Sequence, residues 1–218
     1  MPPPHPILAR RFAAILTSAA CRRIDYWLGG LHVTGGGLAT VARALELGGA
    51  DGKGITITVS PTDANIAASY YTGVNELNVP SESWASTDRF EKLSIVHEAI
   101  HALRDMQGVN VMWNNKPYRP KHMTDESAAY LGGCLYDIYW QQDCLGTVSE
   151  SPPWLADRKA AIHAVAYKLA LASTKRQNGS PIPIEDLHRL NTTYRQSARK
   201  AGINPAISIR YDGIPMPK

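Results

Sequence analysis

The residues in this sequence that are best suited to chemistry are His97, Glu98 and His101, which form the pattern His-Glu-x-x-His. The spacing of apolar residues around them predicts a continuous helix, and histidines four positions apart lie on one face of a helix. Both imidazoles can therefore reach a single zinc ion at about 2.0–2.1 Å. Glu98 lies beside the metal and can carry a proton from a bound water to a leaving group. The pattern predicts metal-assisted hydrolysis.

A five-residue pattern can arise by chance, so the surrounding sequence has to support the prediction of a metal site. Apolar residues at Ile95, Val96 and Ile100 predict that the helix is buried. Two histidines and a glutamate in such surroundings cost free energy unless they have partners. A metal ion is one such partner. The alternative is a pair of hydrogen-bonded core histidines with a solvated glutamate.

A catalytic zinc site needs a third protein ligand and an open position for water or substrate. Glu126 is the preferred candidate, because it opens the next predicted helix after the chain has had room to turn back. Small residues over 128–134 allow that helix to approach the motif helix closely. Asp125 and His122 are the alternative ligands. Asp125 and Glu126 also suit the positive N-terminal end of a helix, with no metal involved.

The combination of His97-Glu98-Ala99-Ile100-His101 with Glu126 on the following helix resembles the gluzincin branch of the zincin zinc metallopeptidases. The resemblance covers residues 75–136. It implies one catalytic Zn²⁺ held by His97, His101 and Glu126, with a peptide or protein as the substrate. It also implies that Glu98 is the general base and then the general acid of peptide-bond hydrolysis.

Two further roles follow from the same resemblance. Asp105 stands four positions after His101 and would orient that histidine through its second ring nitrogen. The predicted strand at Asn75–Val79 precedes the motif helix, where zincins have an edge strand that binds an extended peptide by strand addition.

Some positions depart from the family patterns. Gluzincins carry an aspartate four positions after the third ligand, where this chain has Tyr130. Tyr130 is a candidate either for stabilising an oxyanion or for packing between the two helices. Arg104 and Gln107 occupy the positions of the glycine and third histidine of metzincins, which excludes that branch. The chain is more similar to small proteins that combine His-Glu-x-x-His with a later Glu-x-x-Ala-Tyr helix.

The rest of the sequence predicts a single α+β domain over residues 1–218, helix-dominated, with a small sheet, a loose segment at 1–5 and the motif core at about 74–145. The C-terminal helices are expected to support a minimal zincin-like core. Gly35-Gly36-Gly37 is predicted to be a loop and lacks the pattern of a phosphate-binding site. Helices are expected at 7–28, 38–47, 86–108, 124–144, 153–173 and 184–201, and strands at 55–59, 72–80 and 207–211.

Composition and charge narrow the classes of partner. The 218 residues are 44% hydrophobic and 19% charged, which is typical of a globular protein. The net charge of +4 is scattered, so no nucleic-acid-binding surface is expected. No apolar run approaches the roughly 20 residues of a membrane span. Residues 10–21 favour an amphipathic helix over a secretion signal, which leaves a cytoplasmic location and secretion as an effector both open.

Three cysteines without a Cys-x-x-Cys pair argue against a cysteine zinc site and favour buried free thiols, with one disulfide and one free thiol as the alternative. The function expected from the sequence is therefore that of a zinc metallopeptidase. Two alternatives stand beside it: a non-catalytic binding or regulatory module with a zincin-like fold, and a zinc hydrolase acting on a non-peptide amide or ester. The sequence leaves the oligomeric state open.

Overall fold

The computed structural model describes residues 4–49, 54–60, 68–108, 112–113, 116–117, 122–156 and 161–200. Helices make up most of these residues, which confirms the helix-dominated α+β prediction. The helices are α1 (Pro6–Leu16), α2 (Ala19–Arg22), α3 (Gly35–Leu47), α4 (Arg89–Gly108), α5 (His122–Leu145), α6 (Pro153–Ala156), α7 (Ala161–Ser173) and α8 (Ile184–Lys200). The strands are β1 (Asp25–Leu28), β2 (Leu31–Thr34), β3 (Thr56–Val59), β4 (Ser69–Tyr71), β5 (Glu76–Val79), β6 (Met112–Trp113) and β7 (Lys116–Pro117).

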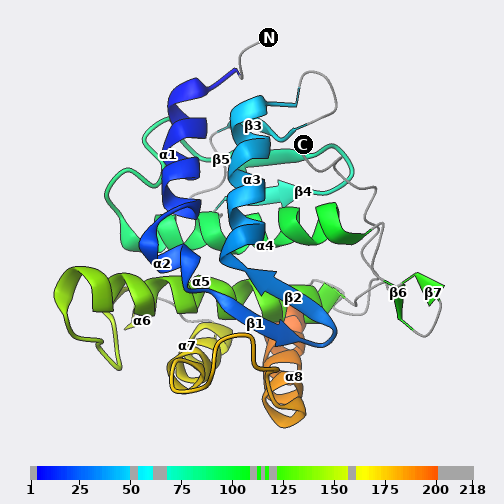
Figure 1. Ribbon diagram of the computed structural model, residues 1–218, viewed down its shortest axis with the longest axis vertical. Coiled ribbons are helices and arrows are strands. Elements are labelled where there is room, and N and C mark those ends of the chain that lie inside the picture. The colour runs from blue at the N-terminus through cyan, green and yellow to red at the C-terminus, as the bar shows by residue number, and fades with distance from the viewer. Residues whose placement is uncertain are drawn as a thin grey trace.

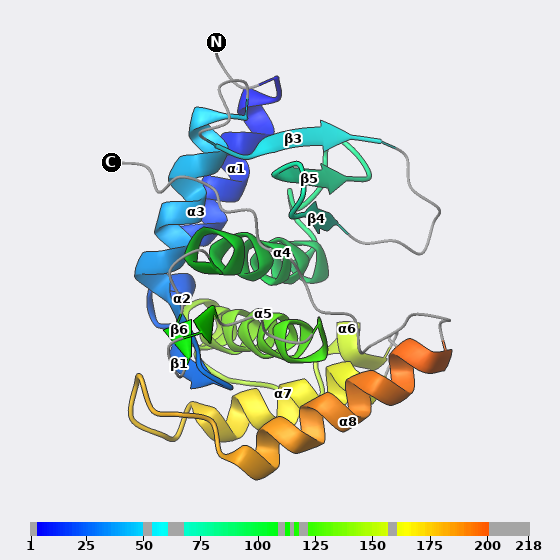
Figure 2. The ribbon, with the colours of Figure 1, turned by 90° about the vertical axis from the view of Figure 1, so that its right-hand side faces the viewer.

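Helices α4 and α5 are the centre of a stack of layers (Figure 2). The sheet of β3, β5 and β4 lies on one side of α4, α5 packs on the other, and α7 and α8 cover the far side of α5. Helices α1 and α3 lie side by side and pack against α4, which they cross (Figure 1). The motif helix α4 is therefore enclosed by protein on most sides, which is why apolar residues surround its histidines.

The three-stranded sheet places β4 next to the motif helix. Strand β5 is central, because Leu77 pairs with Ile57 of β3 in parallel and with Tyr70 of β4 in the antiparallel sense. The prediction that Asn75–Val79 is the edge strand is wrong for this reason. Within the described part of the sheet, β4 is the edge that faces α4. Strand β4 has only three residues, so its sequence pattern is too short to predict it.

The N-terminal region differs from its prediction. The helix expected over 7–28 ends at Leu16, and the Ser18 hydroxyl, which accepts a hydrogen bond from the Cys21 N–H at 3.3 Å, starts the short helix α2. Strands β1 and β2 then form a hairpin whose turn is Gly29-Gly30, with φ angles of 57° and 83°. A two-residue Gly-Gly loop between apolar runs is a recognised hairpin signal, so the sequence did contain this element.

The predicted loop at Gly35-Gly36-Gly37 is the first turn of α3. Thr34 caps this helix, because its side chain accepts a hydrogen bond from the Gly37 N–H at 3.0 Å. A Cβ atom at Gly35 would lie 2.6 Å from the Cα of Arg22, so glycine is needed where α3 begins against α2.

The remaining elements lie close to their predictions. Strand β3, the helix ends at Gly48 and Gly108, and α5 and α8 are confirmed to within two residues. The motif helix begins slightly later than expected, because the Asp88 carboxylate caps it by accepting the Glu91 N–H at 2.9 Å. The helix predicted over 153–173 is α6 followed by α7, and residues 157–160 lie outside the described residues. The predicted strand at 207–211 also lies outside them.

The three cysteines are free thiols, of which Cys21 and Cys134 are buried and Cys144 is exposed. The prediction of buried thiols is therefore confirmed for two of them and wrong for Cys144, which lies in the last turn of α5. Over the residues that the structure describes, no helix combines the length and the apolar character required to cross a bilayer.

A buried carboxylate at Asp137 ties three helices together. Its Oδ1 accepts hydrogen bonds from Arg89 at 2.7 and 3.0 Å, and its Oδ2 accepts from Gln141 at 2.9 Å and from the Trp154 indole at 3.1 Å. Every contact is charge-assisted, and the Asp137 side chain is only 2% exposed. This network fixes the start of α4 and the position of α6 on α5.

We expect Asp137→Ala to lower the free energy of unfolding by about 3 kcal/mol, because it leaves the Arg89 guanidinium and the indole without their acceptor. The matched control is Asp143→Ala, which removes the partner of Arg23 from an ion pair whose side chains are 43% and 33% exposed. That control should cost less than about 1 kcal/mol. Urea unfolding of both variants provides the comparison, and equal losses would contradict the assigned role of Asp137.

Candidate metal centre

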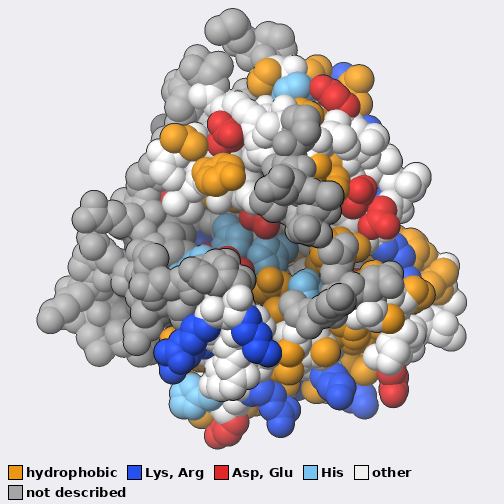
Figure 3. All heavy atoms as spheres, turned by 180° about the vertical axis from the view of Figure 1, so that it is seen from behind, with side chains coloured by type: hydrophobic (Ala, Val, Ile, Leu, Met, Phe, Trp, Pro, Cys, Tyr) orange, Lys and Arg blue, Asp and Glu red, His pale blue; other side chains and the backbone are white. Residues whose placement is uncertain are grey.

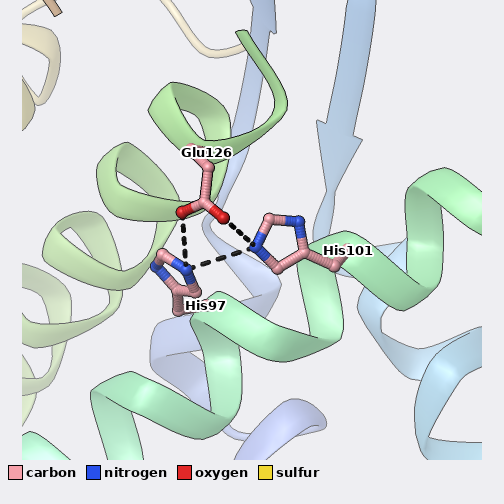
Figure 4. A group of neighbouring side chains, drawn as sticks. All are labelled: His97, His101 and Glu126. Atoms are coloured by element: carbon pink, nitrogen blue, oxygen red, sulfur yellow. Dashed lines mark hydrogen bonds and ion pairs between the residues drawn. The ribbon is translucent and has the colours of Figure 1, made fainter. Parts of the chain in front are cut away.

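Three predicted ligands, His97, His101 and Glu126, converge in the structure (Figure 4). The two histidines project from successive turns of α4, and Glu126 faces them from the first turns of α5. His97 Nε2 lies 3.2 Å from His101 Nε2 and 3.5 Å from Glu126 Oε2. His101 Nε2 lies 3.6 Å from Glu126 Oε1. Each histidine thus turns its Nε2 atom toward the Glu126 carboxylate and faces a different oxygen of it.

The spacing of these donors fits a metal ion. Ligands held at about 2.0–2.1 Å around a tetrahedral ion lie about 3.4 Å from one another. The two Nε2 atoms are 3.2 Å apart, and each lies 3.5 or 3.6 Å from the Glu126 oxygen that faces it, which is close to that value. The same three residues form a group whose ligand atoms all lie within 4.8 Å of each other. The structure thus contains a site that could hold a metal ion.

Close packing of α4 on α5 brings the ligands together. A Cβ atom on Gly132 would lie 2.2 Å from Ile100 Cδ1 and 2.9 Å from the Tyr26 hydroxyl, so a larger residue would have to displace these side chains. The Tyr26 hydroxyl, from β1, donates to the Ala128 carbonyl at 2.7 Å and secures the same part of α5. The expectation that small residues on α5 permit a close approach is confirmed.

Asp125 contacts the outer ring nitrogen of His101, so we interpret it as a residue that orients this histidine and not as a third donor at the centre. It is 1% exposed, and its Oδ2 is hydrogen-bonded to His101 Nδ1, while its Oδ1 lies 3.9 Å from Arg104 Nε. Once His101 is neutral, a carboxylate at Nδ1 favours the tautomer in which the Nε2 lone pair faces His97 and Glu126. This is the tautomer that a metal ligand needs.

The resemblance assigned this orienting role to Asp105, and the structure corrects that assignment. Asp105 is fully buried, and its Oδ2 accepts a hydrogen bond from the Tyr70 hydroxyl at 2.9 Å. It therefore faces the sheet and fastens β4 to α4. Asp125 occupies the side of His101 that faces α5, so it takes the position beside Nδ1.

Glu98 lies beside the three ligands, between α4 and β4. Its Oε2 accepts a hydrogen bond from the Tyr70 N–H at 2.8 Å, and its Oε1 lies 3.9 Å from His97 Nε2. Burial raises the pKa of Glu98, although the nearby His97 and His101 partly offset this effect. A carboxyl group with a raised pKa, held by one oxygen and turned toward the centre with the other, is suited to proton transfer.

A cleft opens onto this group. Its volume is about 300 Å³, and it is bounded by β4 on one side and by α4 and the start of α5 on the other. Figure 3 shows histidine and acidic side chains together in a hollow near the middle of that face of the molecule. The residues that line the cleft are Ser69, Tyr70, Thr72, Glu98, His101, His122, Asp125 and Glu126.

The other two residues considered from the sequence take different places. His122 lies on the cleft wall, where its Nε2 is 2.8 Å from the Tyr194 hydroxyl and 3.7 Å from Glu126 Oε1. Tyr130 packs edge-on against the His97 ring, with ring centroids 4.6 Å apart. Tyr194 was not predicted, because it lies on α8 and no local spacing connects it to the motif.

Opposite charges on neighbouring side chains at the centre shift the pKa values of His101 and Glu126 in opposite directions. Burial opposes a charge on His101, but Asp125 and Glu126 outweigh it and raise the pKa of this histidine. Burial likewise opposes ionisation of Glu126, but His101 and His97 outweigh it and lower the pKa of this carboxyl group. Without a metal, the group at neutral pH therefore holds a protonated histidine beside an ionised glutamate.

Metal binding must displace the proton on His101, because an imidazole ligand is neutral. We expect zinc affinity to rise by up to about tenfold per pH unit between about pH 6 and pH 8, with release of about one proton per zinc ion bound. The sign follows from the raised pKa, since His101 keeps its proton across this interval in the metal-free protein. Calorimetry in buffers of different ionisation enthalpy measures the release. An affinity independent of pH would contradict the charge state described above.

Comparison with known proteins leaves the resemblance to gluzincins as a prediction. No family model, no curated protein and no solved structure matches the chain. The case for a function therefore depends on the three convergent ligand atoms, the carboxylate beside them and the cleft they face.

Proposed function

We propose that this protein is a zinc-dependent hydrolase, and specifically a metallopeptidase. The observation that carries the proposal is the convergence of His97, His101 and Glu126, with Glu98 beside them at the floor of a cleft. Two histidines and one glutamate form a donor set that suits zinc. Structural zinc sites are closed by four protein ligands, whereas three leave a position for water or substrate.

In the proposed mechanism, the residues around the centre have different roles in hydrolysis. A zinc ion bound there would polarise a substrate carbonyl and lower the pKa of water. Glu98 takes the proton of the attacking water and delivers it to the leaving amine. The Tyr70 N–H holds one oxygen of this carboxylate at 2.8 Å, so the other keeps its direction during both transfers.

Strand β4 supports a peptide as the substrate. The Tyr70 N–H donates to Glu98 and so points away from β5. In an antiparallel pair, the N–H and C=O of one residue point to the same side, so the Tyr70 carbonyl also faces the cleft. The Tyr70 N–H is occupied by Glu98, so an extended peptide in the cleft would pair with this edge through the carbonyl group. Thr72, in the turn that follows β4, also lines the cleft.

His122 is our candidate for the residue that stabilises charge on the substrate. Its ring lies on the cleft wall, and the buried Tyr194 hydroxyl holds it at 2.8 Å. A donor in this position can bind the substrate carbonyl oxygen as negative charge develops on it. Tyr130, by contrast, packs against His97, and this contact favours the packing interpretation of that residue.

We expect His122→Leu to lower kcat/KM by about 10²-fold at saturating zinc, because one oxyanion donor is lost. The matched control is His188→Leu, which replaces an exposed histidine on α8 and should leave kcat/KM unchanged. Steady-state kinetics on a cleaved peptide provide the measurement. Full activity of His122→Leu would assign charge stabilisation to another group.

The test of the proposed function begins with removal of metal by a chelator and return of one equivalent of zinc. The protein is then incubated with a mixture of peptides, and the products are identified by mass spectrometry. Cleavage that disappears with chelation and returns with zinc is the expected result. Bound zinc without turnover of any peptide would favour a binding or regulatory module. Turnover of only non-peptide amides or esters would favour the other alternative.

A further inference from the structure

Helix α8 packs directly on the turn of α5 that carries Glu126. The Tyr194 hydroxyl bonds His122 Nε2 at 2.8 Å. The Asn191 amide bridges two other residues of the same turn, Ser127 Oγ at 2.8 Å and Thr124 Oγ1 at 3.5 Å. Three neighbouring side chains of α5 are thus held by two residues that lie one turn apart on α8.

This turn needs support from outside its own helix. Helix α5 begins at His122, so Glu126 lies just after its first turn. The backbone N–H groups of that first turn have no partners within the helix. Helix ends fray more readily than helix centres. On the side facing α4, Asp125 holds the turn through His101. On the opposite side, the contacts come from α8.

The sequence of α8 explains how it reaches this position. Leu187, Leu190, Tyr194 and Ala198 recur at helical spacing and are all buried. Asn191 and Tyr194 therefore bring polar atoms into an otherwise apolar interface. Buried polar atoms need partners, and the first turn of α5 provides them. Such contacts fix one relative position of the two helices, which apolar contacts alone do less strictly.

We propose that Tyr194 and Asn191 are positioning residues for the third metal ligand: through the first turn of α5, they hold the Glu126 carboxylate opposite His97 and His101. The inference rests on the proposed metal site, and it assigns a role to the C-terminal helix in metal affinity. Neither residue touches the centre itself. Groups hydrogen-bonded directly to a metal ligand contribute about 10–100-fold to affinity, and these two residues act one contact further out, so we expect about tenfold at most.

The test measures zinc affinity with zinc alone, by competition with a chromogenic chelator. Tyr194→Phe removes one hydroxyl, and Asn191→Ala removes the bridging amide. Each should weaken zinc binding by about three- to tenfold. The matched control is Tyr167→Phe, which also removes a buried hydroxyl, one bonded to Gln141 and to the Ser149 carbonyl near the opposite end of α5. This control should lower stability and leave zinc affinity unchanged.

A second comparison separates positioning from general loosening of the fold. In a Glu126→Ala background, Tyr194→Phe should have no further effect on zinc affinity, because the ligand that it positions is gone. Unchanged affinity in both Tyr194→Phe and Asn191→Ala would overturn the inference, as would an equal loss in Tyr167→Phe. Failure of the proposed metal site is a different outcome: zinc binding would then be insensitive to His97→Ala and His101→Ala.

Discussion

Glu98→Gln is expected to lower the rate of peptide hydrolysis by about 10²- to 10⁴-fold while zinc remains bound. Glutamine keeps the size of the side chain and an oxygen that can accept the Tyr70 N–H, which Glu98 accepts at 2.8 Å. It cannot take up a proton from water. Since His97, His101 and Glu126 are unchanged, zinc stoichiometry should stay at that of the unmodified protein.

Glu91→Gln is the matched control for this variant. Glu91 lies on the same helix, and its Oε2 accepts a backbone N–H, that of Ala85, also at 2.8 Å. Burial also raises the pKa of Glu91. Both substitutions therefore perturb a partly buried carboxylate on α4, but only Glu98 lines the cleft. Equal rates for Glu98→Gln and the unmodified protein would remove the proton-transfer step from the mechanism.

Glu126→Ala is expected to weaken zinc binding by more than about 100-fold, because loss of a ligand exceeds the effect of losing an outer partner. The two histidines alone leave the ion with half of a tetrahedral set of ligands. Competition with a chelator of known affinity measures the change, and Glu91→Gln again is the control that should bind zinc normally.

Comparing the loss of zinc affinity in Asp125→Asn with that in Glu126→Ala distinguishes a metal ligand from a residue that orients a ligand. Asp125 contacts His101 Nδ1 and not the centre, so its loss should weaken zinc binding by about 10–100-fold, less than the loss of Glu126. The reverse order would make Asp125 the third ligand and Glu126 the outer partner. This experiment decides between two of the alternatives that the sequence leaves open.

Local spacing predicted the core of the site. Two histidines at i and i+4 share a helix face whatever surrounds them. Once α4 forms, His97 and His101 therefore lie next to each other. Glu126 could be selected because a small-residue helix follows the motif helix, and the clash that a Cβ on Gly132 would make with Ile100 shows why those residues are small.

Contacts between distant segments could not be predicted in the same way. Asp105 and Asp125 both suit an orienting role, and only the packing of α5 on α4 decides for Asp125. Strand β4 is three residues long, and it is a strand only because it pairs with β5. Tyr194 reaches His122 only because α8 crosses the start of α5. Each depends on tertiary structure that no periodicity encodes.

Zinc K-edge X-ray absorption of the protein loaded with one equivalent of zinc tests the central claim most directly. The spectrum should show imidazole scattering from two histidines, with nitrogen and oxygen ligands at about 2.0–2.2 Å and no sulfur. His97→Ala should remove half of the imidazole signal. A sulfur shell at about 2.3 Å, or a spectrum without imidazole, would place the metal elsewhere and contradict a zinc centre at His97, His101 and Glu126.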